Sequence, residues 1–284
     1  MENQAHFLMC APHFFGVEYV INPWMQGKEG SVGRREAEDQ WHALHHLFSD
    51  ALGARVFLVP AQPGLPDMVF TANAGLTHQG ICVPARFRHS QRQGEELPYR
   101  TWFEAQGLTL RDLPEGICFE GAGDALFDEG AAQSPRPLLW AAHGFRTDLA
   151  SHAFLSDFFG VEVVSLGLID PRYYHLDTCF CPLPNGFLLW NPMAFDEESR
   201  ETVERRVWPE RRFAVSEADA RQFACNAVGL IAAGGRPGVV LNVASDTLVK
   251  ALESWGFAVY QTPLGEFMKA GGSAKCLTLR LSER

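Results

Sequence analysis

The chain has 284 residues, of which 46% are hydrophobic and 20% charged, and its formal net charge is −10. This is the composition of a globular protein with a large apolar core. The acidic balance argues against a nucleic-acid partner, because phosphate contacts need clustered Lys and Arg. No stretch reaches the roughly 18 apolar residues of a membrane span, so we expect no membrane partner either.

The first residues and the cysteine count favour a cytoplasmic location. The segment 1–6 lacks the basic start and the apolar run of a signal peptide. Seven cysteines, an odd number, fit reduced thiols better than a disulfide framework. No low-complexity segment or long Ser/Gly linker divides the chain, so we expect a single domain over residues 1–284.

Short apolar segments alternate with amphipathic segments along the whole chain. We expect strands at 7–10, 55–59, 75–83, 125–127, 137–141, 162–165, 178–183, 186–190, 238–242, 258–261 and 276–281. We expect helices at 36–52, 93–106, 147–159, 198–207, 217–223 and 246–255. In the first of these, the apolar spacing of Trp41, Leu44 and Phe48 follows the helical period, and Ser245 is a suitable start for the last.

The order of these elements is mixed α/β rather than a simple alternation. Asn185-Gly186 lies between two apolar segments, which is a strong signal for a β-hairpin. A doubly wound parallel sheet would have one strand for each helix. The pattern here instead indicates a strand-strand-helix-strand unit that recurs several times.

Cys276 is the most informative residue for function. It follows Gly271-Gly272-Ser273, where a flexible loop meets an expected buried strand. Glycines permit unusual backbone angles and close approach of a ligand. Lys275 and a nearby imidazolium are expected to lower the pKa of this thiol. The alternative is a buried core cysteine, which is a common state for this residue.

His175 and Asp177 form a second candidate pair. If they lie on a strand, residues at i and i+2 face one side, so imidazole and carboxylate share a cavity. A histidine there can donate a proton to a leaving group and then activate water. A core histidine is the alternative. A metal site of His175, Cys179 and Cys181 is a weak alternative, because the spacing matches no usual zinc site.

Two further motifs contain small residues beside polar ones. Glu120 and Asp124 flank Gly121-Ala122-Gly123, which suggests a tight backbone that presents a carboxylate; a polar turn is the alternative. Asn73 lies between alanines in Thr71-Ala72-Asn73-Ala74-Gly75, as expected where a substrate approaches the backbone, or at a strand-to-turn junction. Neither a dinucleotide fingerprint nor a P-loop is present.

Taken together and in this order, these segments resemble the guanidine-modifying, or pentein, superfamily. The resemblance extends from Asn22-Pro23-Trp24-Met25 to Cys276. The superfamily includes arginine deiminases, dimethylarginine dimethylaminohydrolases, amidinotransferases and arginine dihydrolase domains. The resemblance implies a five-bladed αβ propeller of strand-strand-helix-strand units around a central polar channel, which agrees with the repeat described above.

The resemblance also implies roles for individual residues. Cys276 matches the family nucleophile, and His175 matches the general acid/base in its His-x-Asp-Thr setting. Glu120 and Asp177 match the acids that hold the guanidinium group. A planar guanidinium suits bidentate pairing with carboxylates, which would present its central carbon to the thiolate. The intermediate implied is a covalent amidino-thioether.

The remaining expected residues bind the substrate. Arg146 and Arg92 match the arginines that hold its α-carboxylate, with Arg86 and Arg88 as competitors of Arg92. The set is completed by Asn22, Asn73, Phe70 and Gly121. No metal and no cofactor is implied. Two glycine-containing segments, 20–32 and 264–272, are candidates for a lid over the site.

Asn73 distinguishes the members of the superfamily. Arginine deiminases and dimethylarginine hydrolases carry an aspartate there, whereas the Thr-Ala-Asn-Ala-Gly motif and Asn22 look like the arginine dihydrolase type. An amide both donates and accepts hydrogen bonds, so it suits retention of a neutral ureido intermediate.

We therefore expect a cysteine hydrolase of arginine or a close derivative, first of all an arginine dihydrolase that forms ornithine, ammonia and carbon dioxide. A single-step deiminase or dimethylarginine hydrolase that forms citrulline is the alternative, and an amidinotransferase or a catalytically inert binding protein is less favoured. The expected partner is a small guanidino compound. The sequence does not decide between a monomer and a homo-oligomer.

Overall fold

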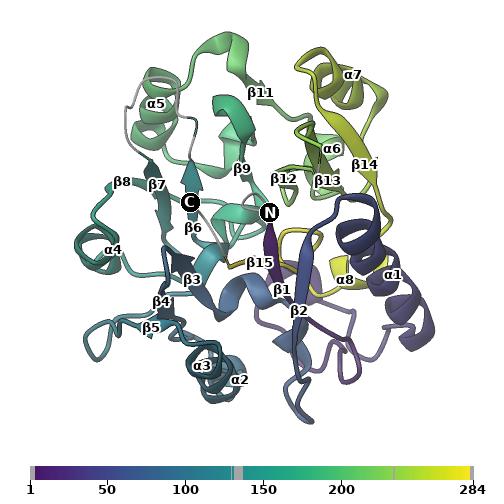
Figure 1. Ribbon diagram of the computed structural model, residues 1–284, viewed down its shortest axis with the longest axis vertical. Helices are drawn as coiled ribbons and strands as arrows, with labels where there is room; N and C mark the ends of the chain where they lie inside the picture. The colour runs from purple at the N-terminus through teal and green to yellow at the C-terminus, as the bar shows by residue number, and fades with distance from the viewer. Residues whose placement is uncertain (1–3, 129, 131–136, 233, 282–284) are drawn as a thin grey trace.

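The five small sheets of the protein surround a common centre (Figure 1). The computed structural model describes residues 4–128, 130, 137–232 and 234–281. In that part of the chain, each sheet has three strands. The sheets contain β3 (Gly75–His78), β4 (Ile81–Pro84) and β5 (Thr109–Leu110); β6 (Ala125–Asp128), β7 (Leu138–His143) and β8 (Glu162–Gly167); β9 (Phe180–Leu183), β10 (Phe187–Trp190) and β11 (Arg212–Ala214); β12 (Val228–Ile231), β13 (Pro237–Leu241) and β14 (Ala258–Gln261); and β15 (Leu279–Arg280), β1 (His6–Cys10) and β2 (Arg55–Val59).

The same connection recurs in every sheet. An inner strand pairs antiparallel with the middle strand, and the middle strand pairs parallel with the outer strand. Helices or helical segments connect the middle strand to the outer one, as a parallel crossover requires. The helices are α1 (Arg34–His46), α2 (Ser90–Gln93), α3 (Glu96–Ala105), α4 (Ser151–Phe159), α5 (Glu197–Arg206), α6 (Glu217–Arg221), α7 (Asp246–Ser254) and α8 (Gly265–Met268). The predicted five-bladed propeller of strand-strand-helix-strand units is therefore confirmed.

One sheet joins the two ends of the described chain. In it, β15 pairs antiparallel with β1, with Leu279 opposite Leu8. β1 in turn pairs parallel with β2, with Phe7 opposite Val56. This sheet closes the ring of five.

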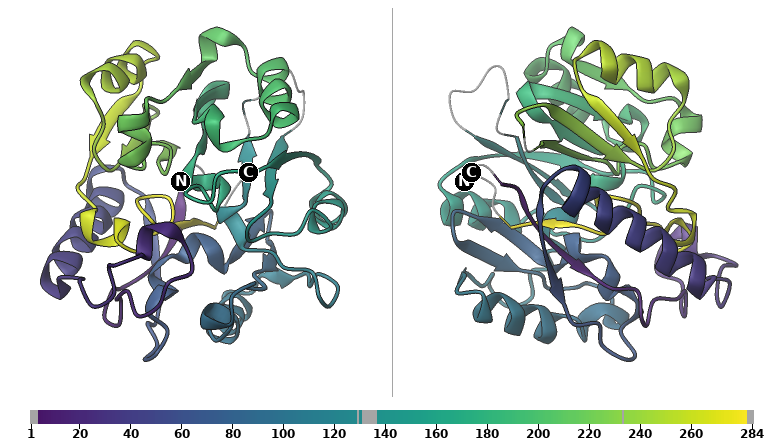
Figure 2. Two further views of the ribbon diagram at one scale, coloured as in Figure 1. Left: turned by 180° about the vertical axis from the view of Figure 1, so that it is seen from behind. Right: turned by 45° about the vertical axis from the view of Figure 1, so that its right-hand side comes forward.

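The inner strands β3, β6, β9, β12 and β15 lie nearest the centre (Figure 1). Among these inner strands, β3 contacts β15, β6 contacts β9, and β9 contacts β12. The longer helices α1, α3, α4, α5 and α7 lie outside the sheets (Figure 2). They bury apolar faces against the sheets; in α1 these include Ala37, Trp41 and Leu44.

Several local predictions are confirmed. Asn185 and Gly186 take positive φ angles of 65° and 73°, which produces the turn between β9 and β10. Ser245 caps α7, where its hydroxyl accepts a hydrogen bond from Leu248 N at 3.3 Å.

Other predicted boundaries are wrong. Segment 75–83 is two strands rather than one, because Gln79 and Gly80 take positive φ angles and turn the chain between β3 and β4. Segment 93–106 is interrupted at Gly94, between α2 and α3. The strand expected at 276–281 is reduced to Leu279–Arg280. Strands β5, β11 and β12 were not predicted; β5 and β11 are too short for a clear alternation.

None of the helices in the described part of the chain combines the length and the apolar composition needed to cross a membrane.

Candidate active site

The predicted catalytic residues meet at the start of the inner strands. Asn73 lies in the 3-10 turn η4 (Thr71–Ala74) before β3, and Glu120 precedes the turn η5 (Gly121–Gly123) before β6. His175 precedes the turn η6 (Leu176–Thr178), which contains Asp177, before β9. Cys276 lies in the turn before β15. Because the inner strands surround one centre, residues far apart in sequence come into contact there.

Cys276 contacts a carboxylate. Its Sγ lies 3.4 Å from Asp177 Oδ2 and 3.6 Å from Oδ1. Burial, and then the charge of Asp177, raise the pKa of the thiol well above its ordinary value. The expected lowering of the thiol pKa beside Lys275 is therefore wrong. Lys275 Nζ donates to Ala122 O at 3.2 Å, and its charge partly offsets the burial that raises the pKa of Asp177 to about 6.

His175 lies between a carboxylate and an amide. Its Nε2 is 2.7 Å from Glu120 Oε2, and its Nδ1 is 3.5 Å from Asn73 Nδ2. Burial lowers the pKa of His175 to about 4, although the hydrogen bond with Glu120 opposes this. The imidazole is therefore neutral near pH 7. The expectation that His175 and Asp177 share a strand is wrong, because a 3-10 turn begins between them.

Glu120 joins His175 to Arg146. Arg146 Nη1 donates to Glu120 Oε2 at 3.0 Å, and the backbone N–H of Arg88 donates to Oε1 at 3.2 Å. Burial alone would raise the pKa of Glu120, but the charge of Arg146 and the hydrogen bond from His175 lower it overall. Glu120 is therefore ionised, and it orients the imidazole that faces it.

A hydroxyl and a second carboxylate fix the backbone around these groups. Thr147 Oγ1 accepts from Glu120 N at 3.0 Å and donates to Asp124 Oδ2 at 2.7 Å. Asp124 Oδ1 accepts from Leu176 N at 3.1 Å. Asp124 thus connects the turns before β6 and β9, on which Glu120 and His175 lie.

Asn73 is held by Arg92. Arg92 Nη1 donates to Asn73 Oδ1 at 2.8 Å, and Asn73 Nδ2 donates to Glu120 O at 3.3 Å. Glu95 binds the same guanidinium through both oxygens, at 2.9 and 2.8 Å. The amide of Asn73 therefore has a fixed position beside His175.

Two other predicted residues, Phe70 and Gly121, lie where the turns pack closely together. The ring of Phe70 lies against the backbone of Gly272, where a Cβ atom would collide with the ring. Gly121 has φ 65°, and a Cβ there would lie 2.7 Å from Gly75 O. These contacts pack the turns before β3, β6 and β15 together without intervening side chains.

The two lid candidates contact each other and the site. Asn22 accepts from Trp24 N at 2.9 Å and donates to Ala270 O at 3.0 Å, so it joins 20–32 to 264–272. Arg146 Nη2 donates to Ile21 O at 3.0 Å. Tyr174 donates to the carbonyl oxygen of residue 271 at 2.8 Å. The predicted catalytic side chains are buried, and both segments contact residues of this cluster or their chain neighbours.

Two buried polar residues near the site were not predicted as site residues. Asp67 Oδ2 accepts from Tyr19 OH at 2.9 Å, whereas its Oδ1 has no hydrogen-bond partner among the described residues. Asn226 lies before β12 and contacts Cys276 Sγ at 3.1 Å. The signal for Asp67 was its place in the same motif as Asn73. Asn226 gave no signal, because the strand that follows it was not predicted.

The weak metal alternative has no support in the geometry. Cys181 Sγ donates to Ala227 O at 3.3 Å, and Cys179 Sγ donates to Leu176 O at 3.5 Å. The residues that the structure describes contain no group of three or more His, Cys, Asp or Glu side chains placed to hold a metal ion.

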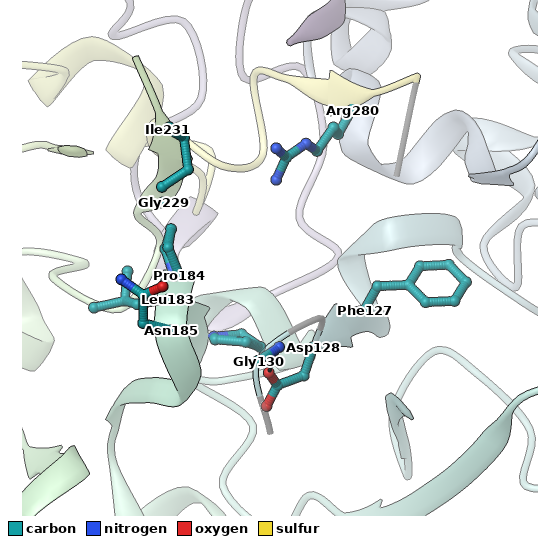
Figure 3. A pocket seen from close by; sticks show the side chains of 10 residues that line it. Phe127, Asp128, Gly130, Leu183, Pro184, Asn185, Gly229, Ile231 and Arg280 are labelled. Carbon is teal, nitrogen blue, oxygen red and sulfur yellow. Dashed lines mark hydrogen bonds between the residues drawn. The ribbon is translucent and has the colours of Figure 1, made fainter. Parts of the chain in front are cut away.

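A cavity of about 240 Å³ lies at the opposite end of the inner strands (Figure 3). Its lining includes Asp128, Leu183, Ile231 and Arg280, which are the last residues of β6, β9, β12 and β15. The predicted catalytic groups lie before the first residues of the same strands. The cavity is therefore separate from the cluster that they form.

Comparisons with known proteins agree with this geometry. The model of the family described as "N,N dimethylarginine dimethylhydrolase, eukaryotic" matches residues 20–282. The bifunctional arginine dihydrolase/ornithine cyclodeaminase AgrE of Nostoc is 50% identical over 283 residues, which is 100% of this chain and 38% of AgrE. The N(G),N(G)-dimethylarginine dimethylaminohydrolase of Mycobacterium tuberculosis is 39% identical, over 97% of this chain and 85% of that protein.

A solved structure extends the likeness to three dimensions. The crystal structure of the N-terminal domain of cyanobacterial ArgZ, an arginine dihydrolase, bound to substrate, has a TM-score of 0.92 and 49% identity, and 99% of each chain is covered. The chain thus spans 38% of the length of the bifunctional relative AgrE and nearly all of this separate ArgZ domain. The predicted superfamily is confirmed, and the chain belongs to the N,N-dimethylarginine dimethylhydrolase family.

Proposed function

We propose that residues 1–284 act as one catalytic domain that hydrolyses the guanidinium group of arginine twice and forms ornithine, two molecules of ammonia and carbon dioxide. The observation that carries this proposal is the buried cluster of Cys276, Asp177, His175 and Glu120 with an amide, Asn73, beside the imidazole. The likeness to AgrE and to the ArgZ domain supports arginine as the substrate.

The first half of the reaction is attack by sulfur. The cationic guanidinium binds against the carboxylate of Asp177, 3.4 Å from Cys276 Sγ. The added positive charge favours loss of the thiol proton, which burial and Asp177 otherwise disfavour. The thiolate adds to the central carbon. Neutral His175 takes up the proton that the thiol loses and delivers it to one nitrogen, ammonia leaves, and an amidino-thioether remains on Cys276.

The second half is hydrolysis of that thioether. Neutral His175, oriented by Glu120, removes a proton from water as the water adds to the carbon. The C–S bond breaks, the thiol is restored and the ureido compound, citrulline, is formed. In the dihydrolase reaction citrulline stays bound, and the thiolate adds to its ureido carbon. The second nitrogen leaves as ammonia, water then releases the carbon from Cys276 as the carbamate of ornithine, and this carbamate breaks down to ornithine and carbon dioxide.

The charged end of the substrate is proposed to bind near two buried arginines. Arg92 and Arg146 remain the candidates for the α-carboxylate, although Glu95 and Glu120 already pair with them. Asp67, whose Oδ1 has no hydrogen-bond partner among the described residues, is suited to the α-ammonium. The charges of both arginines act on Asp67, so the three residues lie near one another.

The test is incubation with L-arginine while ammonia, citrulline and ornithine are followed together. We expect two ammonia for each ornithine and little free citrulline. One ammonia for each citrulline would replace the proposal with a single-step deiminase. A parallel incubation with N,N-dimethylarginine tests the second candidate, which the M. tuberculosis relative favours. Dimethylamine and citrulline from that incubation, with no product from arginine, would establish it. An added amine acceptor that becomes amidinated would identify a transferase.

A further inference from the structure

The turn before β12 contributes a residue to the catalytic cluster, as the turns before the other four inner strands do. Asn226 lies two residues before Val228, the first residue of β12. Its side chain is fully buried, with 0% exposure. A buried amide is costly unless its donors and acceptor are used.

The side chain of Asn226 uses both ends of its amide. Its Oδ1 accepts from Ser273 N at 3.0 Å and from Cys276 N at 3.1 Å. Its Nδ2 donates to Asp177 O at 2.9 Å and to Cys276 Sγ at 3.1 Å. One amide therefore connects the nucleophile, the backbone that carries it and the carboxylate residue that faces it.

The network fixes the orientation of this amide. Ser273 N and Cys276 N are both donors, so the atom that faces them must be the acceptor oxygen of Asn226. The amino group then has to face the sulfur. A reversed amide would place its N–H groups against two N–H groups and its oxygen against the carbonyl oxygen of Asp177.

The sulfur otherwise has a negative neighbour. Asp177 lies 3.4 Å from Cys276 Sγ, and both residues are buried. A thiolate in that position is opposed by the carboxylate charge and by the loss of water. An N–H donor at 3.1 Å offsets part of this cost, and it favours the charged form of the sulfur over the neutral form.

We propose that Asn226 is a further catalytic residue, which stabilises the Cys276 thiolate through Nδ2–H and fixes the loop of the nucleophile through Oδ1. This inference rests on the proposed role of Cys276 as nucleophile. It assigns a function to the turn of the fourth sheet, so that all five turns before the inner strands contribute to the reaction.

The test is Asn226→Asp in the full chain, which keeps the acceptor oxygen and replaces the amino group with an oxygen. Asn242→Asp is the matched control. Asn242 is also a buried amide that accepts from a backbone N–H, Leu264 N at 2.9 Å, and donates to a backbone carbonyl, Gln222 O at 3.1 Å. No contact joins Asn242 to Cys276.

Two quantities are measured for each variant. The first is the rate of Cys276 alkylation by iodoacetamide from pH 7 to pH 10, read from the modified Cys276 peptide. The second is kcat and KM for arginine. We expect Asn226→Asp to slow alkylation at pH 8 by about tenfold, which is the loss of thiolate for a pKa increase of one unit. We expect kcat to fall at least as far, with KM changed less than about threefold.

Alkylation and kcat for Asn226→Asp that fall no further than for Asn242→Asp would overturn the proposal. If Asn226→Asp does not fold, Asn226→Ser removes the donor without adding charge and is held to the same criterion. The alkylation measurement needs no turnover. A wild type that is inert towards arginine would therefore contradict the proposed function, while alkylation still decides the role of Asn226.

Discussion

At the residue scale, the amide of Asn73 is the group that we propose distinguishes a neutral intermediate from a cationic one. Its oxygen is taken by Arg92, and its amino group faces Glu120 O and the imidazole of His175. An aspartate there would pair with Arg92 and add a negative charge beside His175. Such a site would favour a cationic guanidinium over a neutral ureido group, which carries no charge to be attracted.

We therefore predict that Asn73→Asp converts the reaction towards a single step. The ratio of ornithine to citrulline should fall by about tenfold, which corresponds to the net value of one hydrogen bond, about 1.4 kcal/mol. The products are quantified from arginine at equal conversion. Asn242→Asp, a buried amide outside the site, is the control and should leave the ratio unchanged. An unaltered ratio in Asn73→Asp would show that this residue does not control how much citrulline goes on to ornithine.

At the element scale, helix α4 is joined to its sheet by a buried histidine. His152 Nδ1 lies 2.7 Å from Ser165 Oγ on β8, and Nε2 lies 3.3 Å from Ala142 O on β7. Burial lowers the pKa of His152 from its ordinary 6.5 to about 4. Between these pH values the unfolded chain binds a proton that the folded protein does not bind. Stability is therefore lost as the pH falls from 6.5 towards 4.

This linkage predicts a pH effect that His152→Gln removes. From pH 7 to pH 4.5, the wild-type free energy of unfolding should decrease by about 2.5 kcal/mol more than that of His152→Gln. Urea unfolding at each pH measures the difference. His13→Gln, at an exposed histidine, is the control and should follow the wild type. Parallel curves for wild type and His152→Gln would contradict the prediction.

At the scale of the whole molecule, the pairing of β15 with β1 closes the ring of sheets and positions Cys276, the proposed nucleophile. Leu279 is fully buried, opposite Leu8, and it lies three residues after Cys276. It belongs to the same apolar cluster as Met68 and Leu76. Loss of this contact weakens the closing sheet.

We predict that Leu279→Ala lowers the free energy of unfolding by about 3 kcal/mol, the usual effect of truncating a fully buried leucine. Urea denaturation at pH 7.5 is the measurement. The control is Leu97→Ala, because Leu97 is 71% exposed on α3. Equal stability of the two variants would show that the closing pair contributes little.

The sequence alone predicted the repeat and a set of residues that the structure brings together. Cys276, His175, Asp177 and Glu120 could be singled out because each lies in a short motif that resembles a motif of the superfamily. Their catalytic roles stay a prediction. The hairpin at Asn185-Gly186 could be predicted because its conformation depends on local backbone preference. These features are local, so a linear pattern contains them.

The tertiary structure decided what depends on several segments at once. The pKa of Cys276 is raised rather than lowered, because the thiol is buried and lies beside the charge of Asp177. Glu120 orients His175 because the turns before β6 and β9 lie side by side. Asn226 contacts Cys276 across 50 residues of sequence. Contacts of this kind follow from the closure of the ring, which no single segment specifies.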